Sequence, residues 1–325
     1  MAYDNLKLEK SFYGSPKGFA GALESADPTE QYRGTALGEL DAYERQLKRF
    51  GIHVSGAGSD RVEKFFQTAE TATLFPEYIA RAVRRGMERA DVLPRITATT
   101  TQFSGVDYRS IETAAGTGDP QAAIGEAAQL PETLVRNKTV LTTLKKHGRL
   151  LSASYEAIRF HRLELLTVAL RQIGAEIAKT VLADAVVVLS GNAQSVDMAG
   201  AAPVYNDLLS VWNSMEPFAL TTLLAPAAQM QQLLALPELR DAAAGLNFHG
   251  SGQMVTPLGA ELIKSDAVPA GSILALDKNA ALEMVTAGGI VTDYDKLIDR
   301  QLERAAITTT VGFAKIHAGA VKVLA

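Results

Sequence analysis

Residues Asp91 to Asn192 constrain the fold more than any other part of the chain, because β-prone segments are followed there by one uninterrupted helical pattern. β-Branched residues favour strands, whereas Gly and Pro interrupt them. Few large apolar side chains anchor the middle of this segment, so we interpret it as an extended limb that reaches another molecule. The pattern predicts a first strand at residues 95–103 that continues at 106–111. A Gly/Ala/Pro-rich tip follows at 114–131, and a return strand at about 133–152.

A long helix is predicted from about Arg159 to Leu189. At 1.5 Å per residue, roughly thirty residues make a rod of about 45 Å. Gly191 and Asn192 are of the types that commonly end a helix. Apolar side chains recur every three or four residues, as on one helical face, at Leu163, Leu166, Leu170, Ile173, Ile177 and Val181.

The composition indicates an ordered globular protein of one large domain or two ordinary ones. The 325 residues are 47% hydrophobic and 21% charged, which is enough to build a core. No apolar run is long enough for a transmembrane helix, and the N-terminus does not read as a secretory signal. Cysteine is absent, which excludes disulfides and thiolate chemistry. We therefore expect a cytoplasmic protein that does not bind membranes.

Charge is distributed unevenly, although the net charge is only −4. Residues 1–150 carry 20 Lys and Arg against 19 Asp and Glu, and residues 151–325 carry 12 against 17. These charges are either two solvated faces or a basic limb that lies on an acidic surface of the next subunit. The return strand is basic at Arg136, Lys138, Lys145, Lys146 and Arg149, whereas Asp293, Asp295, Asp299 and Glu303 make the C-terminal segment acidic.

The N-terminal part has too little periodic apolar content to predict a separate core. We expect its first sixty residues to form an arm that lies over other surfaces. Helices are predicted at about 35–50, from an Asp60 cap to about Thr71, and from Pro76 at a first helical position to Arg89.

The segment after Val204 alternates helical and strand patterns, which predicts a small mixed α/β domain. Trp212, with Leu208, Leu209, Val211 and Met215, is expected to fill its core. The last two strands, 304–313 and 315–323, are expected to pair antiparallel. The other predicted elements are helices 205–212 and 227–236 and strands 219–224, 258–265, 272–276 and 280–285.

Every pattern that usually carries catalysis is incomplete. The histidines lack metal-ligand spacing, and the Gly56–Gly58 and Gly116–Gly118 turns lack the Gly-Lys-Ser/Thr of a phosphate loop. Ser251 lacks the glycines of a nucleophile elbow, and Asp293 with Asp295 lacks the rest of a calcium loop. We therefore expect no catalytic residue, cofactor or metal. A metabolic enzyme that uses the middle α/β domain as its catalytic unit is the alternative from another class.

The order of parts resembles the major capsid protein of tailed bacteriophages, which has the Hong Kong 97-type capsid fold that encapsulin shells share. The order is N-terminal arm, two-stranded extended loop, long helix, central α/β domain and strand-rich C-terminal segment. Three stretches carry the local likeness: Gly125–Glu132, Leu144–Glu156 and Ala178–Asn192.

The resemblance implies an α+β fold with four regions. Residues 1–94 would form the N-terminal arm with helices, and residues 95–152 the extended β-hairpin loop. Residues 153–197 with 271–325 would form the peripheral domain, which contains the long spine helix. Residues 198–270 would form the axial domain, which gathers around a symmetry axis.

The resemblance also implies a non-enzymatic structural protein of the virion, assembled in the host cytoplasm. Hexamers and pentamers would build an icosahedral shell around double-stranded DNA, without sequence-specific binding and with portal, scaffolding and decoration proteins as further partners. An encapsulin-type nanocompartment shell is the alternative within the same fold. The contact candidates between subunits are the five basic residues of the return strand with Glu126, Gln129, Asp293, Asp295 and Asp299.

Some members of this family join subunits covalently through a lysine on the extended loop. Here the stretch around Gln129 contains no lysine, and the nearest one is Lys138. We therefore expect the limb to hold its neighbours by non-covalent contacts. About ninety residues precede the limb, too few for a large helical scaffold, so any scaffolding protein is expected to be separate.

Overall fold

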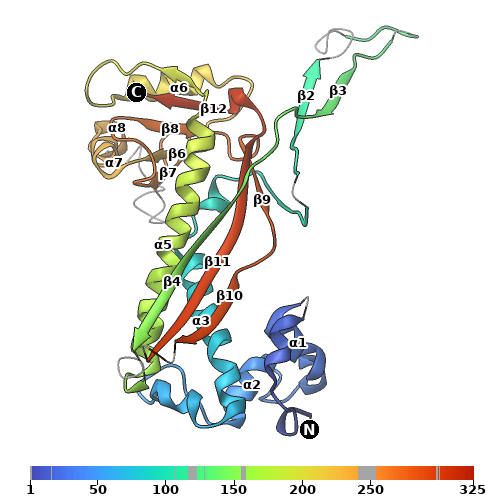
Figure 1. The fold of residues 1–325 in the computed structure, drawn as a ribbon. Coiled ribbons are helices and arrows are strands. Elements are labelled where there is room, and N and C mark those ends of the chain that lie inside the picture. Colours follow the sequence, from blue (N-terminus) through green and yellow to red (C-terminus); the bar gives the residue numbers. More distant parts are fainter. Residues whose placement is uncertain are drawn as a thin grey trace. The chain divides into compact units, whose positions relative to one another are not determined.

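A computed structural model describes most of the chain and divides it into two compact units (Figure 1). Unit 1 contains residues 1–90, 147–178 and 290–309, and unit 2 contains residues 91–146, 179–289 and 310–325. The described residues are 2–15, 17–105, 107–115, 123–127, 129–154, 159–240, 254–297, 299 and 301–325. The predicted turn at Gly116–Gly118, the helical turn just after Ser154 and the site around Ser251 lie outside these ranges.

Unit 1 begins with short helices that are fixed by side-chain caps and aromatic packing. The Asp41 side chain accepts a hydrogen bond from Glu44 N (2.9 Å), and Glu44 accepts one from Asp41 N in return, which sets the start of α2. The helices are η1 (Ala2–Asp4), η2 (Lys10–Gly14), α1 (Gly18–Ala26), η3 (Thr29–Tyr32), α2 (Ala42–Arg49), η4 (Val62–Phe66) and α3 (Ala69–Ala90).

The first sixty residues bury side chains in a core that they share with α3. Phe19, Leu23 and Tyr43 are buried there, and the Tyr43 hydroxyl donates to Leu74 O of α3 (3.2 Å). A fully buried ion pair joins Arg45 Nε to Asp27 Oδ2 at 2.7 Å, and the Arg45 guanidinium lies over the Tyr32 ring. The sequence pattern missed this core because aromatic rings and one buried ion pair build it, rather than a periodic aliphatic stripe.

The expectation that a new helix opens at Pro76 is also wrong, because α3 continues through this residue. Proline lacks an N–H and disturbs the preceding helical turn. The Tyr13 hydroxyl donates to Thr73 O (2.8 Å) and accepts from Glu77 N (3.0 Å). A side chain of η2 thus bridges the helical ladder beside the proline, and α3 stays continuous.

The long helix predicted from the periodic pattern is confirmed as α5 (Leu163–Ser190). Within unit 1 its first half crosses α3 at two glycines. A Cβ on Gly86 would lie 2.1 Å from Arg171 O, and a Cβ on Gly174 would lie 2.1 Å from Val83 O. The two helices therefore pack backbone to backbone, which no larger residue at these positions permits.

Unit 2 contains a five-stranded sheet in the order β5-β12-β8-β6-β7. Figure 1 labels four of these strands, β12, β8, β6 and β7. Leu223 pairs with both Leu262 and Ala275, and all three side chains lie in one core with residues of helices α6 and α7. The strands are β5 (Gln194–Val196), β6 (Thr222–Ala225), β7 (Glu261–Lys264), β8 (Ile273–Leu276) and β12 (Val321–Leu324); the helices are α6 (Tyr205–Ser214), α7 (Ala227–Leu234) and α8 (Pro237–Arg240).

Two expectations about this region need correction. Trp212 is 52% exposed and Leu209 is also exposed, so neither fills the core, whereas Leu208, Val211 and Met215 do. Strand β12 pairs with β5 and β8 rather than with the preceding strand, because residues 316–320 lead the chain into another sheet. Two inner strands of the sheet, β8 and β12, lie outside residues 198–270. The axial and peripheral assignments remain predictions.

The limb is not two long strands, as the sequence pattern suggested, but four shorter ones with different partners. β1 (Thr99–Gln102) pairs parallel with β9 (Leu282–Thr286), and β4 (Leu144–Ser154) pairs with β11 (Leu302–Lys315). β2 (Ile111–Ala115) and β3 (Thr133–Asn137) pair with each other as an antiparallel hairpin, and a bridge between Tyr108 and Thr142 joins the two sides further along. β11 also pairs with β9 and with β10 (Val291–Leu297), a strand that the sequence pattern did not predict. A short η5 (Leu93–Arg95) precedes β1, and η7 (Ala318–Ala320) precedes β12.

Candidate subunit interface

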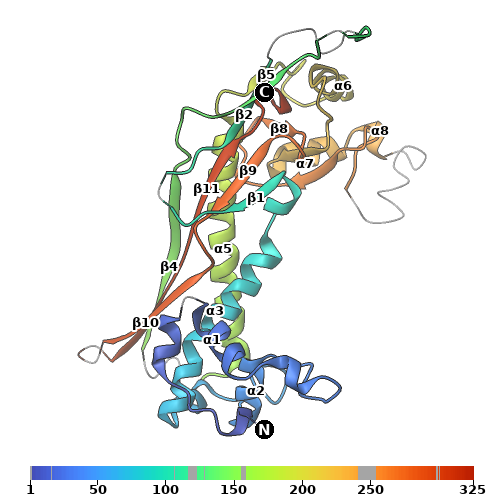
Figure 2. The same cartoon turned by 90° about the vertical axis from the view of Figure 1, so that its right-hand side faces the viewer.

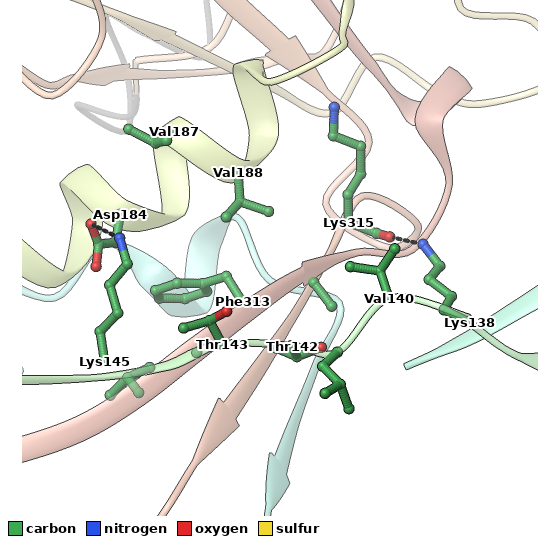
Figure 3. A pocket seen from close by; sticks show the side chains of 14 residues that line it. Lys138, Val140, Thr142, Thr143, Lys145, Asp184, Val187, Val188, Phe313 and Lys315 are labelled. Atoms are coloured by element: carbon green, nitrogen blue, oxygen red, sulfur yellow. Dashed lines mark hydrogen bonds and ion pairs between the residues drawn. The ribbon is translucent and has the colours of Figure 1, made fainter. Parts of the chain in front are cut away.

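An apolar groove of about 460 Å³ lies in unit 2 between the segment before β4, the second half of α5 and the end of β11 (Figure 3). Gly312 lets the backbones approach here, because a Cβ at this position would lie 2.8 Å from Thr143 O. The apolar lining comes from three separate segments: Val140, Leu141, Val187, Val188, Val311 and Phe313.

Several aliphatic side chains that line the groove are exposed to solvent in the single subunit. Val140 is 75% exposed and Val187 is 64% exposed, and Leu141 beside Val140 is also exposed. Contiguous exposed apolar side chains with a polar rim are typical of protein–protein contact sites. The sequence signal was the run Val186–Val188 in α5, since no single helical face buries three consecutive residues.

Three lysines line this groove against one acidic residue, Asp184, which pairs with Lys145. Lys138 Nζ donates to Lys315 O and, at 3.3 Å, to Ile316 O. Lys315 Nζ donates to Gly191 O (2.6 Å) just beyond the C-terminus of α5, where a cation is favoured. Burial, and then the charge of Lys138, lower the pKa of Lys315 below its ordinary value. An added carboxylate would oppose the effect of the Lys138 charge, so this end of the groove suits an acidic group.

The five basic candidates on the return strand differ in their partners. Lys145 Nζ lies 3.0 Å from Asp184 Oδ1, and Arg149 Nε lies 3.7 Å from Glu176 Oε2; both carboxylates belong to α5. Lys138 donates to main-chain oxygens of β11 and the following residue. Arg136 and Lys146 are exposed and have no hydrogen-bond or ion-pair partner within the described part of the chain.

The acidic candidates do not pair with these bases within the described residues. Asp293 and Asp295 are exposed on β10, and Asp295 Oδ2 lies 3.3 Å from Arg304 Nη2 on the neighbouring strand. Asp299 is also exposed. The partners of Lys145 and Arg149, Asp184 and Glu176, were missed because the contact between a strand and a distant helix leaves no spacing signal in the sequence.

The hairpin end of the limb has the opposite character to the groove. Ile124 and Leu130 are exposed, and so are Glu126, Gln129 and Glu132. Residues 123–132 contain two glutamates and no basic residue. The chain thus carries an apolar, acidic segment and an apolar, basic groove, both uncovered in a single subunit.

Within the described ranges, no three His, Asp or Glu side chains gather as a metal site. None of the helices described is long and apolar enough to span a membrane.

Comparison with known proteins identifies the family. No curated protein matches the chain significantly. Among solved structures, a virus-like particle from Pyrococcus furiosus is similar with a TM-score of 0.53 at 9% identity, over 77% of this chain and 98% of that one. A protein of Mycobacterium phage Adephagia gives 0.52 at 13% identity, over 72% and 89%. The capsid structure of cyanophage P-SCSP1u gives 0.50 at 12% identity, over 70% and 85%.

These similarities confirm the predicted α+β capsid fold at the level of the fold. The family model described as phage capsid protein matches residues 136–322, which is more than half of the chain. The matched range includes α5, the groove and all of the five-stranded sheet except the end of β12. The chain therefore belongs to the phage capsid protein family.

Proposed function

We propose that this chain is the major capsid protein of a tailed phage and self-assembles, through hexamers and pentamers, into an icosahedral shell around double-stranded DNA. It acts as a structural protein and not as an enzyme. The observation that carries the proposal is the uncovered groove at Val140 and Val187, together with an apolar, acidic loop segment on the same chain. Association of copies gives each surface a partner.

In this proposal, residues 123–132 of one subunit lie in the groove of a neighbour. Ile124 and Leu130 would cover the exposed valines, and Glu126 would approach Lys138 or Lys315. In this arrangement the loop is acidic and the neighbour's groove is basic. The sequence pattern had suggested the reverse, a basic limb on an acidic surface of the next subunit. Each exposed charge pair contributes only about 0.2–1 kcal/mol, so shell stability would come from many repeated contacts.

The remaining partners follow from the same role. The shell would meet a portal, a scaffolding protein and decoration proteins, and it would contact packaged DNA without reading its sequence. A subunit of net charge −4 limits adhesion to the phosphate backbone. The virion is the expected location of the mature protein, after assembly in the host cytoplasm.

The test replaces Val140 and Val187 together by Asp and examines the purified protein by negative-stain microscopy and sedimentation. The unmodified chain should form closed particles far larger than one subunit, whereas the variant should remain small but folded by circular dichroism. Val291→Asp is the matched control, because Val291 is exposed on β10 and does not line the groove. A chain that stays monomeric under all assembly conditions would contradict the proposal.

A protein nanocompartment of the encapsulin type is the second candidate, since the similarity spans nearly the whole of one virus-like particle subunit. The content of native particles separates the two functions. Nuclease-protected double-stranded DNA supports the phage shell, and an enclosed cargo protein without DNA supports the nanocompartment.

A further inference from the structure

A second uncovered apolar feature lies on α6, away from the groove described above. Leu209 and Trp212 are three residues apart, so they lie on one side of the helix. Trp212 is 52% exposed and Leu209 is 36% exposed, whereas Leu208 and Val211 face the core. Exposed tryptophan beside leucine is rare on a surface that no partner covers, and Trp is a frequent anchor of interfaces.

An open groove of about 450 Å³ lies on α7 in the same unit. Met230 and Leu234 supply its apolar wall, and Arg240 and Lys264 stand at its rim. Both cations are exposed, with no hydrogen-bond or ion-pair partner among the described residues. The groove therefore suits an apolar group in an acidic setting.

The surroundings of Trp212 have that chemistry. Residues 193–220 contain Asp197, Asp207 and Glu216 and no Lys, Arg or His. Asp207 is buried and accepts hydrogen bonds from Ala199 N and Val204 N, which leaves the exposed Asp197 and Glu216 as the acidic groups. The Trp ring is also the best side-chain partner for a cation above its face.

Leu209 and Trp212 of α6 do not reach the α7 groove of their own chain. α6 packs on β12, and α7 packs on β6 and β7, toward the other edge of the sheet. Both helices contribute to one core on the same sheet face, so their exposed sides point away from that core. Figures 1 and 2 both show α6 apart from α7 and α8.

We propose that Leu209 and Trp212 of one subunit occupy the α7 groove of the next, so that copies join head to tail. The proposal rests on the self-assembly proposed above and specifies the surfaces that meet. A contact between two different patches generates a closed ring when its rotation closes, whereas a contact between identical patches stops at a dimer. Arg240 would approach the Trp212 ring, and Lys264 would face the acidic groups around α6.

Cross-linking tests the direction of this contact, because the chain contains no cysteine. A variant with Leu209→Cys and Gln231→Cys, treated with a short bis-maleimide during assembly, should give a ladder of covalent oligomers. Either single variant should give none. Dimers from Leu209→Cys alone, or no ladder from the double variant in particles that still form, would overturn the proposal.

Tryptophan fluorescence tests the same contact in the unmodified protein. Trp212 is the only tryptophan of the sequence, so the emission reports on its surroundings alone. Its emission should shift to shorter wavelength when particles form, since the ring leaves water. Particles that form with unchanged emission would contradict the contact but not the capsid function. A chain that forms no particles at all would instead count against the capsid function.

Discussion

The β2–β3 hairpin and the five-stranded sheet of unit 2 use similar residues under opposite conditions. Strands β6 and β8 bury all of their residues, four in each. In the hairpin, Ile111 and Val135 lie on one face of the ribbon, and both are exposed. An isolated two-stranded hairpin is marginal in water. The sheet is therefore stabilised by the subunit itself, whereas the hairpin carries apolar surface that the described part of the subunit leaves uncovered.

The largest expected effect follows directly from this difference. Leu223→Ala, in the core of the sheet, should lower the free energy of unfolding by about 2–5 kcal/mol, because it removes buried methyl groups and leaves a cavity. Val135→Ala should change it by no more than about 0.5 kcal/mol, since Val135 is 63% exposed. Urea denaturation of unassembled subunits measures both values. Equal losses would mean that the hairpin contributes to the subunit's own core.

The segment that leads into the hairpin is held by one buried carboxylate. Glu283 of β9 accepts hydrogen bonds from Thr101 Oγ1 (2.7 Å), Ser110 Oγ (2.5 Å) and the Tyr108 hydroxyl. Glu283 is buried, and the Tyr108 pKa is raised by burial and then by this hydrogen bond. These hydrogen bonds tie Thr101, Tyr108 and Ser110 to β9.

Glu283→Ala should therefore cost about 1–3 kcal/mol, the penalty for buried hydroxyl groups that lose their acceptor. The effect should be local, with faster amide hydrogen exchange around β1 and Ser110 and little change in the five-stranded sheet. Glu112→Ala, on the exposed hairpin, is the control and should leave both measurements unchanged. Uniformly faster exchange in both regions would show that Glu283 supports the whole unit rather than the base of the hairpin.

Sequence reasoning succeeded where the cause of a structure is local. α5 was predicted because its apolar spacing lies within the helix and its stop signal, Gly191, follows it directly. β1 was predicted as a strand, but its partner was not, since Thr100 pairs with Met284, far away in the sequence. Trp212 was placed in the core because its residue type favours burial, and helical phase decides otherwise: Leu208 and Val211 face inward on either side of it.

The candidate interface was predicted only in part. The sequence shows that basic residues cluster in the limb, but it does not show which residues they contact, because those partners are brought close only by the fold. Lys145 and Arg149 meet α5 because β4 leads back along the helix that follows it in the sequence. The exposed valines of the groove come from three segments that no short pattern connects.

The smallest expected effects concern these charges, where an internal partner and an external one can be told apart. A variant with Lys145, Lys146 and Arg149 all replaced by Ala should weaken assembly most at low salt, where screening is least. Lys145→Ala alone should also lower subunit stability by up to about 1 kcal/mol, because it removes the exposed ion pair with Asp184.

Lys146 isolates the external contribution, because it has no partner within the described part of its own chain. Lys146→Ala should leave the free energy of unfolding unchanged and still slow assembly at low salt, with the difference disappearing as salt rises. Light scattering during assembly measures the rate, and Lys179→Ala, at an exposed lysine of α5, provides a charge-matched control. If both variants slow assembly equally, net charge accounts for the effect; a specific loss in Lys146→Ala places this lysine against a neighbour.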